Sequence, residues 1–555
     1  MPNAASPKPR HSRVQFEPKL LTVLREGYGL ADLRADMIAG LTVAIVALPL
    51  SMAIAIASGV GPERGLFTAI IGGFLVSALG GSRFQIGGPA GAFIVLVSAC
   101  VADIGVDGLI LATFLSGFLL LGMGLLRLGS YIKFLPYPVT VGFTAGIGVI
   151  IFSSQIKDLL GLHLTGSETG PILEKLATLW QARDTLTPAA LSVAVATVVL
   201  ILGLRAVRPR WPGMLIAVVI VSAAAVLIGL PVETIYSRFG DLPRLPPWPA
   251  LPVLSLATLG AALPYALSFT LLGAIESLLS AVVADGMSGH RHRPNAELLA
   301  QGVANSAAAI FGGFCVTGTI ARTATNVRAG SRGPLSGMFH AIFVLAFLLI
   351  AAPLAGYIPL AALAGVLALV AWNMIERAEI AALVRTSPGD ALVLAVTFGL
   401  VVLRDLTEGI VVGFALGGLI FIKRMSENAK LEAPNTPQMD DNFTLQDQVV
   451  VYRIRGAFFF GAAARVASAL DDIGATCRHF VLDFDEVPFV DSTAAHVIES
   501  LARKMARRDG RLYLTGTNTQ VRQMLNAQGV DPQTVDFYTT ITTALNAIAA
   551  HPPKP

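Results

Sequence analysis

The chain has 555 residues, of which 54% are hydrophobic and only 14% are charged, and its net charge is +4. Soluble domains carry about 25% charged residues, so this composition excludes an ordinary soluble protein and predicts one that crosses a membrane many times. Three cysteines, Cys100, Cys315 and Cys477, are far apart in the sequence. Their spacing suits neither a disulfide framework nor a zinc module, and redox or metal chemistry is not expected.

Residues 1–36 are polar and basic and lack the apolar core of a cleaved signal peptide, so we expect a cytoplasmic N-terminal tail. Residues 37–425 then form the predicted transmembrane domain. Its apolar segments are long enough, at about 20 residues, to cross a hydrocarbon core. Two further segments are short and rich in Gly, Thr and Pro. The fourteen elements begin near Met37, Gly65, Pro89, Gly108, Pro138, Pro188, Met214, Leu263, Glu297, Arg322, Leu335, Pro359, Ala391 and Ile410.

Basic residues predict the orientation of these elements, because short cytoplasmic loops collect Lys and Arg. If the N-terminus is cytoplasmic, every inner connection after the fourth element is basic. An even number of elements also returns the C-terminus to the cytoplasm. We therefore expect a multi-pass protein of the bacterial inner membrane with both termini inside. The inner connections hold Arg127, Lys133, Arg205, Arg208, Arg210, "HRHR" at 290–293, Arg328, Arg332, Arg377, Arg385, Lys423 and Arg424.

The character of the chain changes after residue 425. A polar linker at 426–446 precedes a segment at 447–555 in which apolar strands alternate with amphipathic helices. This pattern predicts a soluble α/β domain. Asp491, Ser492 or Thr493 is expected to cap one of its helices, and the exposed "DST" at that helix end is a candidate contact or phosphorylation point for regulation.

Two broken segments repeat at similar places in the two halves of the transmembrane domain. "GGPAGAF" at 87–93 lies in the first half, about 37–230, and "FCVTGTIART" at 314–323 lies in the second, about 262–425. A seven-element unit that starts inside ends outside, so its copy runs in the opposite sense. Paired Gly/Pro-interrupted segments in inverted repeats indicate the substrate site of a transporter. The alternative is that these glycines have no role in binding and only allow the helices to pack closely.

Two half-helices that begin at mid-membrane predict a site for a negative charge. Each N-terminus has unpaired N–H groups and a partial positive charge, and Arg322 adds a full charge inside the membrane. Arg322 could instead be a structural ion-pair partner of Glu276. The candidate substrate-binding residues are Gly88, Pro89, Ala90, Gly318, Thr319, Ile320, Ala321, Arg322 and Thr323.

Several motifs resemble one family. "GPERGLFTAIIGGFLVSALGGSR" at 61–83 is similar to the SulP signature of solute carrier family 26 anion transporters, with Arg64 and Phe67 in place of the usual tyrosines. The "GAIESLLSAVVADG" and "ARTATNVRAG" segments resemble the family too, and the tail looks like its STAS domain, although Ala494 replaces a usual glycine. The resemblance implies a fourteen-helix fold of the uracil-transporter type, a gate domain, an elevator-like core domain and a homodimer.

The Glu276 segment looks most like that of bacterial C4-dicarboxylate carriers. The sodium-bicarbonate carriers have Asp where Glu276 stands and Thr where Ser280 stands, so a proton rather than sodium is the expected coupling ion. Glu276 and Ser280 are the candidate coupling residues. Without an anion, Glu276 is expected to neutralise Arg322; with one, it is expected to take up a proton.

The expected function is secondary active transport of a small anion by alternating access, with proton-coupled C4-dicarboxylate uptake as the favoured form. Sulfate or bicarbonate transport and uncoupled anion conduction remain open, as does a membrane sensor with the STAS domain as its output. No enzyme motif, catalytic residue, cofactor or metal site is predicted. The expected partners are the anion, the lipid bilayer, a second copy of the chain and a cytoplasmic protein at the STAS domain, but no nucleic acid.

Overall fold

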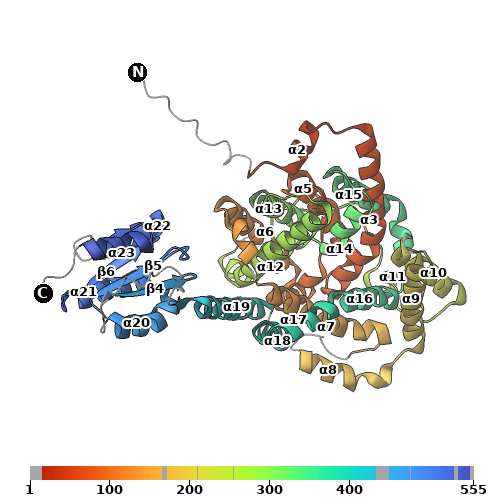
Figure 1. The fold of residues 1–555 in the computed structure, drawn as a ribbon. Coiled ribbons are helices and arrows are strands. Elements are labelled where there is room, and N and C mark those ends of the chain that lie inside the picture. Colours follow the sequence, from red (N-terminus) through yellow and green to blue (C-terminus); the bar gives the residue numbers. More distant parts are fainter. Residues whose placement is uncertain are drawn as a thin grey trace. The chain divides into compact units, whose positions relative to one another are not determined.

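The computed structural model describes residues 15–134, 136–164, 172–208, 211–253, 255–404, 406–432, 449–474, 477–530 and 535–550. Its internal contacts divide the chain into two compact units, Met1–Phe414 and Ala415–Pro555. The first unit is almost entirely helical, and the second contains a five-stranded sheet with helices (Figure 1). Residues 1–14 of the predicted tail, 433–446 of the predicted linker and the predicted inner-loop Arg210 lie outside the described residues.

The first half of the helical unit contains one short strand, β1 (Gly87–Gly88), among its helices. The π-helix η1 continues α4 into α5, and the 3₁₀ helix η2 leads into α6. These helices are α2 (Lys19–Arg25), α3 (Leu30–Ala57), α4 (Pro62–Phe67), η1 (Thr68–Gly72), α5 (Gly73–Leu79), η2 (Gly91–Phe93), α6 (Ile94–Leu125), η3 (Leu128–Phe134), α7 (Tyr137–Leu160), α8 (Ile172–Gln181), η4 (Arg183–Thr185), α9 (Pro188–Val207), α10 (Gly213–Ile228) and α11 (Ile235–Phe239).

The second half repeats this order, with a short strand β2 (Thr317–Gly318) at the place of β1. In each half a long helix, α3 or α12, precedes the strand. Its helices are α12 (Leu256–Ser288), α13 (Pro294–Ile310), α14 (Ile320–Arg328), α15 (Leu335–Ala355), α16 (Leu360–Met374), α17 (Arg377–Thr386), α18 (Pro388–Leu403) and α19 (Leu406–Asn428), the last of which runs across the division between the units.

Each of the fourteen apolar segments predicted from the sequence falls in one of these helices or at a broken helix start. In the described part, eight helices are both long and apolar enough to cross a membrane. The predicted segments that begin near Pro89 and Gly108 share one helix, α6, which is interrupted at Gly105, where φ is 71° and ψ is −177°. Glycine adopts this backbone conformation without the steric penalty of other residues. The number of crossings itself stays a prediction.

Most helix contacts of the first unit fall into two groups that each mix both halves of the chain, and α3 also packs on α16 and α10 of the second group. In the first group, α13 and α12 pack on α6, and α15 packs on α3 and α5. In the second, α16 and α18 pack on α7, and α10 packs on α9. A Cβ atom on Gly117 of α6 would lie 2.7 Å from the Gly302 carbonyl of α13, and one on Gly302 would lie 2.7 Å from the Gly117 carbonyl. Small residues thus allow the helix backbones to approach closely.

The second unit is a sheet in the order β3-β4-β5-β6-β7, with β3 antiparallel to β4 and the remaining pairs parallel. Phe480 and Leu512 belong to the core shared with α20 and α21, whereas Val481 and Tyr513 pack against α23. Neighbouring side chains on a strand point to opposite faces, so helices cover both faces. The elements are β3 (Lys430–Glu432), β4 (Val449–Arg455), α20 (Phe460–Gly474), β5 (His479–Asp483), α21 (Ser492–Ala506), β6 (Arg511–Thr515), α22 (Thr519–Ala527), β7 (Val535–Tyr538) and α23 (Ile541–Ala550).

Candidate functional site

The two broken segments meet inside the helical unit. β1 pairs with β2 in antiparallel fashion, with Gly87 opposite Gly318 and Gly88 opposite Thr317. The Thr319 amide then donates to the Ile86 carbonyl at 3.0 Å. Segments more than 200 residues apart in the chain are therefore joined through their backbones. We call this pairing of β1 with β2 the joint. This short ladder satisfies buried peptide groups that no helix serves, as an interrupted membrane segment requires.

A helix starts directly after each strand. In the first half, Ala90 is extended and leads through η2 into α6; in the second, Thr319 is extended and leads into α14. Neither helix start has a side-chain capping hydrogen bond. Ala321, in the first turn of α14, is exposed, whereas Arg322 beside it is buried. The N–H groups of an uncapped first turn and the helix dipole favour an anion at this position.

Arg322 links the two halves of the site. Its side chain is 1% exposed, and its Nη2 donates to the Ser51 hydroxyl on α3 and to the Pro89 carbonyl, each at 3.2 Å. Nε and Nη1 have no hydrogen-bond partner within the described residues. Gly88 makes room for the guanidinium, because a Cβ there would overlap with Nη1. A buried, partly unsatisfied guanidinium is suited to bind an anion.

The expected ion pair between Arg322 and Glu276 is not formed in the described structure. The Arg322 guanidinium points to Ser51 and Pro89 instead, and Oε2 of Glu276 is buried without a hydrogen-bond partner. The physical reason is the glycine at position 88, which opens space for the guanidinium beside the first broken segment. The expectation that Glu276 neutralises Arg322 directly is therefore wrong for this conformation.

Ser280 and Thr323, predicted for coupling and substrate binding, are engaged with each other and with the backbone. The Ser280 hydroxyl donates to the Thr323 hydroxyl at 3.1 Å, and Thr323 in turn accepts from the Ile86 amide at 3.1 Å. The Thr319 hydroxyl donates to the Ile86 carbonyl at 3.3 Å. These hydroxyl groups hold the strand that enters β1 in place. The remaining predicted residues, Gly88, Pro89, Ala90, Gly318, Ile320 and Ala321, line the joint and the two helix starts.

A row of polar side chains on α13, which binds the segments leading into β1 and β2, was not predicted from the sequence. Glu297 on α13 accepts from the Gly81 and Ser82 amides at 2.8 and 3.1 Å. Asn305, two turns later, accepts from the Val316 amide at 3.0 Å and donates to the Val316 carbonyl at 2.8 Å. Glu297, Gln301 and Asn305 recur every four residues, so they share one helix face. That spacing was the signal in the sequence, and these side chains support the loops before both strands.

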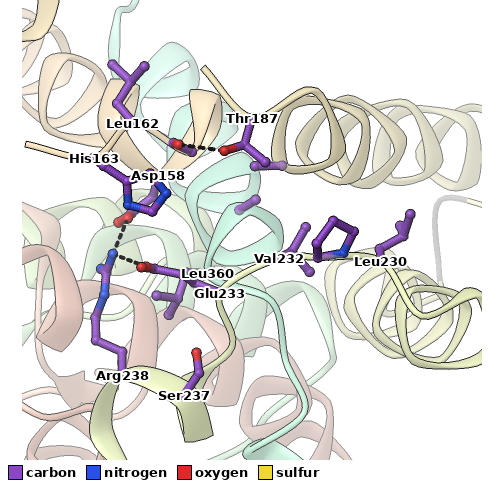
Figure 2. A pocket seen from close by; sticks show the side chains of 14 residues that line it. Asp158, Leu162, His163, Thr187, Leu230, Val232, Glu233, Ser237, Arg238 and Leu360 are labelled. Atoms are coloured by element: carbon purple, nitrogen blue, oxygen red, sulfur yellow. Dashed lines mark hydrogen bonds and ion pairs between the residues drawn. The ribbon is translucent and has the colours of Figure 1, made fainter. Parts of the chain in front are cut away.

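A cavity of about 340 Å³ lies elsewhere in the helical unit, and none of the predicted substrate-binding residues lines it (Figure 2). Its polar side is formed by Arg238, which pairs with Asp158 at 3.1 Å and with Glu233 (Figure 2). Thr187 donates to the Gly161 carbonyl on the opposite wall. Arg238 is thus paired with two carboxylates, whereas Arg322 at the joint keeps two nitrogens without a partner within the described residues.

In the second unit, the structure gives the capping role to Asp491. Its Oδ1 accepts from the Ala494 amide of α21 and its Oδ2 from the Phe460 amide of α20, each at 2.9 Å. Ser492 and Thr493 begin α21 with exposed side chains. They are open to a partner or to modification, whereas Asp491 is engaged.

Comparison with known proteins places this geometry in a family. Residues 33–397 match the sulfate permease family, and residues 442–544 match the STAS domain. The chain is 40% identical over 512 residues to the putative sulfate transporter YvdB of Bacillus subtilis, covering 91% of this chain and 95% of that one. It is 30% identical over 520 residues to the bicarbonate transporter BicA of Picosynechococcus, covering 89% and 90%.

Solved structures agree with this fold. The murine solute carrier 26 family member A9 anion transporter matches with a TM-score of 0.85 at 18% identity, covering 99% of this chain and 97% of that chain. The transmembrane domain of a cyanobacterial BicA matches with a TM-score of 0.61 at 29% identity, covering 70% and 98%. The chain is therefore a multi-pass membrane transporter of anions and not an enzyme, and it belongs to the sulfate permease (SulP, solute carrier 26) family with a C-terminal STAS domain.

Proposed function

We propose that this transporter carries a small dianion by alternating access, with C4-dicarboxylates as its substrates and protons as the coupling ions. The observation that supports this most directly is the Arg322 guanidinium, which is buried with two unpartnered nitrogens beside two uncapped helix starts. A guanidinium offers a planar pair of donors that fits a carboxylate or a sulfate group. The relative named a putative sulfate transporter makes sulfate the second candidate, and the relative named a bicarbonate transporter makes bicarbonate the third.

Movement of the site as one body is the second part of the proposal. The helices that surround β1 and β2 pack in one group, and α7, α9, α10, α16 and α18 pack in another. Strand pairing and the Arg322 contacts hold both halves of the site together. The first group therefore moves as an elevator-like core against the second as a gate. A homodimer in the bacterial inner membrane, with cytoplasmic termini, completes this proposal.

A substrate panel in proteoliposomes tests the substrate class. Uptake of labelled succinate, fumarate, sulfate and bicarbonate is measured with and without an inward proton gradient. We expect the dicarboxylates to accumulate and the gradient to accelerate them. Accumulation of sulfate alone would transfer the proposal to the second candidate. Dissipation of an anion gradient without any proton movement would identify uncoupled conduction.

Glu276 is the proposed proton-binding residue. Its Oε2 is buried and unpartnered, on the helix whose Ser280 contacts α14. An anion at the site adds negative charge and excludes water, and both favour the protonated carboxyl. By reciprocity, a proton on Glu276 strengthens anion binding.

The substitution Glu276→Gln imitates the protonated carboxyl. It should preserve anion binding and exchange while abolishing the acceleration by a proton gradient. Glu174→Gln, at an exposed position of α8, is the matched control and should behave as wild type. Uptake by the Glu276 variant that still rises with the gradient would place the proton elsewhere.

The STAS domain is the proposed regulatory element, with Ser492 and Thr493 as its accessible contact or phosphorylation point. Removal of the chain from Asp440 onward, a residue outside the described ranges, should change the transport rate or the delivery to the membrane. Unchanged trafficking and rate would remove the regulatory role.

A further inference from the structure

A histidine that sequence reasoning did not single out lies beside the candidate site. His340 is on α15, and its side chain is fully buried. Neither of its ring nitrogens has a hydrogen-bond partner within the described residues. Buried imidazole groups are normally hydrogen-bonded. A buried histidine without a partner at either nitrogen therefore requires an explanation.

The surroundings of His340 connect it to the joint between the two halves. A Cβ atom on Gly73 would lie 2.8 Å from the Gly87 carbonyl of β1 and 3.8 Å from Nδ1 of His340. The ring thus lies behind the first strand. Arg322, whose Nη1 lies against Gly88 of the same strand, acts electrostatically on His340. In a low-dielectric interior, charges interact more strongly than in water.

The other charged groups on the elements packed against α15 are already engaged. On α3, Asp36 accepts from the Tyr28 hydroxyl and from the Arg332 and Gly333 amides. Asp32, at the start of α3, accepts from the Gly29 amide. The segments η1 and α5 contain no charged residue.

Two elements contribute charges farther along the helices. On α4, Arg64 donates to the Gly312 carbonyl, and Glu63 folds against Gly61. Arg34, at the start of α3, is exposed. Glu276 is the other unpartnered ionisable group among the proposed site residues. Arg322 is therefore the charge that acts directly on His340, and Glu276 enters the charge balance as the proton-binding residue proposed above.

A charge balance shows what His340 can contribute. With no anion bound, the positive Arg322, an ionised Glu276 and a neutral His340 sum to zero. With a dianion and a protonated Glu276, one negative charge is left over. A proton on His340 removes that excess, and the loaded site is again neutral. A monoanion with a protonated Glu276 is already balanced by Arg322, so His340 stays neutral. Uncompensated charge in a membrane interior is strongly unfavourable.

We infer that His340 is a second proton-binding residue that is protonated only when a divalent anion occupies the site at Arg322. A dianion then crosses with two protons and a monoanion with one. This inference rests on the proposed function and deepens it, because it makes His340 the residue that distinguishes dianions from monoanions. The role is indirect, since the ring acts through the field of the site.

Proton uptake on anion binding tests the inference with the full-length protein. Calorimetric titrations with succinate, sulfate and formate, in buffers of different ionisation enthalpy, give the number of protons bound per anion. Above neutral pH we expect about two for each dianion and about one for formate, so that dianion affinity changes about a hundredfold per pH unit. His340→Gln should lower the dianion value to about one and leave formate unchanged. His163→Gln, at an exposed position, is the matched control.

The outcomes separate the two proposals. Equal proton counts for succinate and formate in the wild type, or an unchanged count in His340→Gln, overturn the role of His340. Failure of the wild type to bind any dianion overturns the proposed function instead. If the variant does not fold, the wild type still decides. With two protons, succinate uptake into proteoliposomes is electroneutral, so a strong dependence of its rate on membrane potential contradicts the inference.

Discussion

The helices α21 and α14 both begin after an N-cap residue with a side-chain oxygen, but the two side chains are used differently. At α21 the side chain of Asp491 accepts from the Ala494 amide and closes the helix end. At α14 the residue in the same position is Thr319, whose hydroxyl turns away and donates to the Ile86 carbonyl. The start of α21 therefore has a hydrogen-bond acceptor from its own N-cap side chain. The start of α14 leaves its first-turn donors uncapped by any side chain.

The difference shows which helix ends are available for a ligand. A capped end gains stability from its own side chain and has little left to offer an anion. An uncapped end inside a membrane must find its acceptor elsewhere. Arg322, three residues after Thr319, adds a positive charge to this helix end, and two of its nitrogens have no hydrogen-bond partner within the described residues. Substitutions at the two ends should therefore affect different properties of the protein.

The largest effect is expected from Arg322→Ala, because it removes the permanent positive charge proposed for the site. Anion affinity should fall at least roughly tenfold, more than the loss of a surface ion pair would produce. Arg322→Lys should restore it in part, since a single ammonium lacks the planar pair of donors. Arg328→Ala, exposed in the last turn of α14, is the control. A folded Arg322→Ala protein with wild-type affinity would make the arginine structural.

A smaller effect on the same end is expected from Gly88→Ala. The new methyl group would overlap with Nη1 of Arg322 and displace the guanidinium. Overpacking of this kind costs about 1 kcal/mol or somewhat more, and we expect part of it as weaker anion binding. Gly122→Ala, on α6 with nothing within 4 Å of its Cβ position, should be silent. Anion affinity is measured for both variants. An unchanged affinity in Gly88→Ala would show that the position of the Arg322 guanidinium does not determine anion binding.

The capped end should respond in stability alone. Asp491→Ala removes the acceptor for the Ala494 amide and should lower the free energy of unfolding of the STAS domain by about 1 kcal/mol. Asp491→Asn should keep most of the wild-type stability. Denaturant titrations followed by a signal from the STAS domain give the stability, and anion affinity should not change. A loss of anion binding in Asp491→Ala would contradict the division between the two helix ends.

Much of this architecture was accessible from the sequence, because its signals are local. Long apolar runs located the helices, and the glycines near Pro89 and before Thr319 located the two interruptions. Strand and helix periodicity after residue 447 identified the α/β fold of the second unit. Each of these signals depends on neighbours in the chain.

The parts that could not be predicted depend on side-chain directions between distant segments. Nothing in the order of residues states that Arg322 turns to Pro89 rather than to Glu276, because the space beside Gly88 exists only after the halves have met. His340 stands alone in an apolar helix and looks like an ordinary core residue. Its importance depends on the absence of partners around it, which only the described structure reveals.

The glycines at the joint also impose a limit on size. A Cβ atom on Gly318 would overlap with the Gln85 side chain, and one on Gly87 would lie 2.8 Å from Cβ of Val76. The two strands therefore meet where neighbouring side chains already fill the space beside each glycine. Substitution at either glycine would force the paired segments apart, so the joint tolerates no added volume.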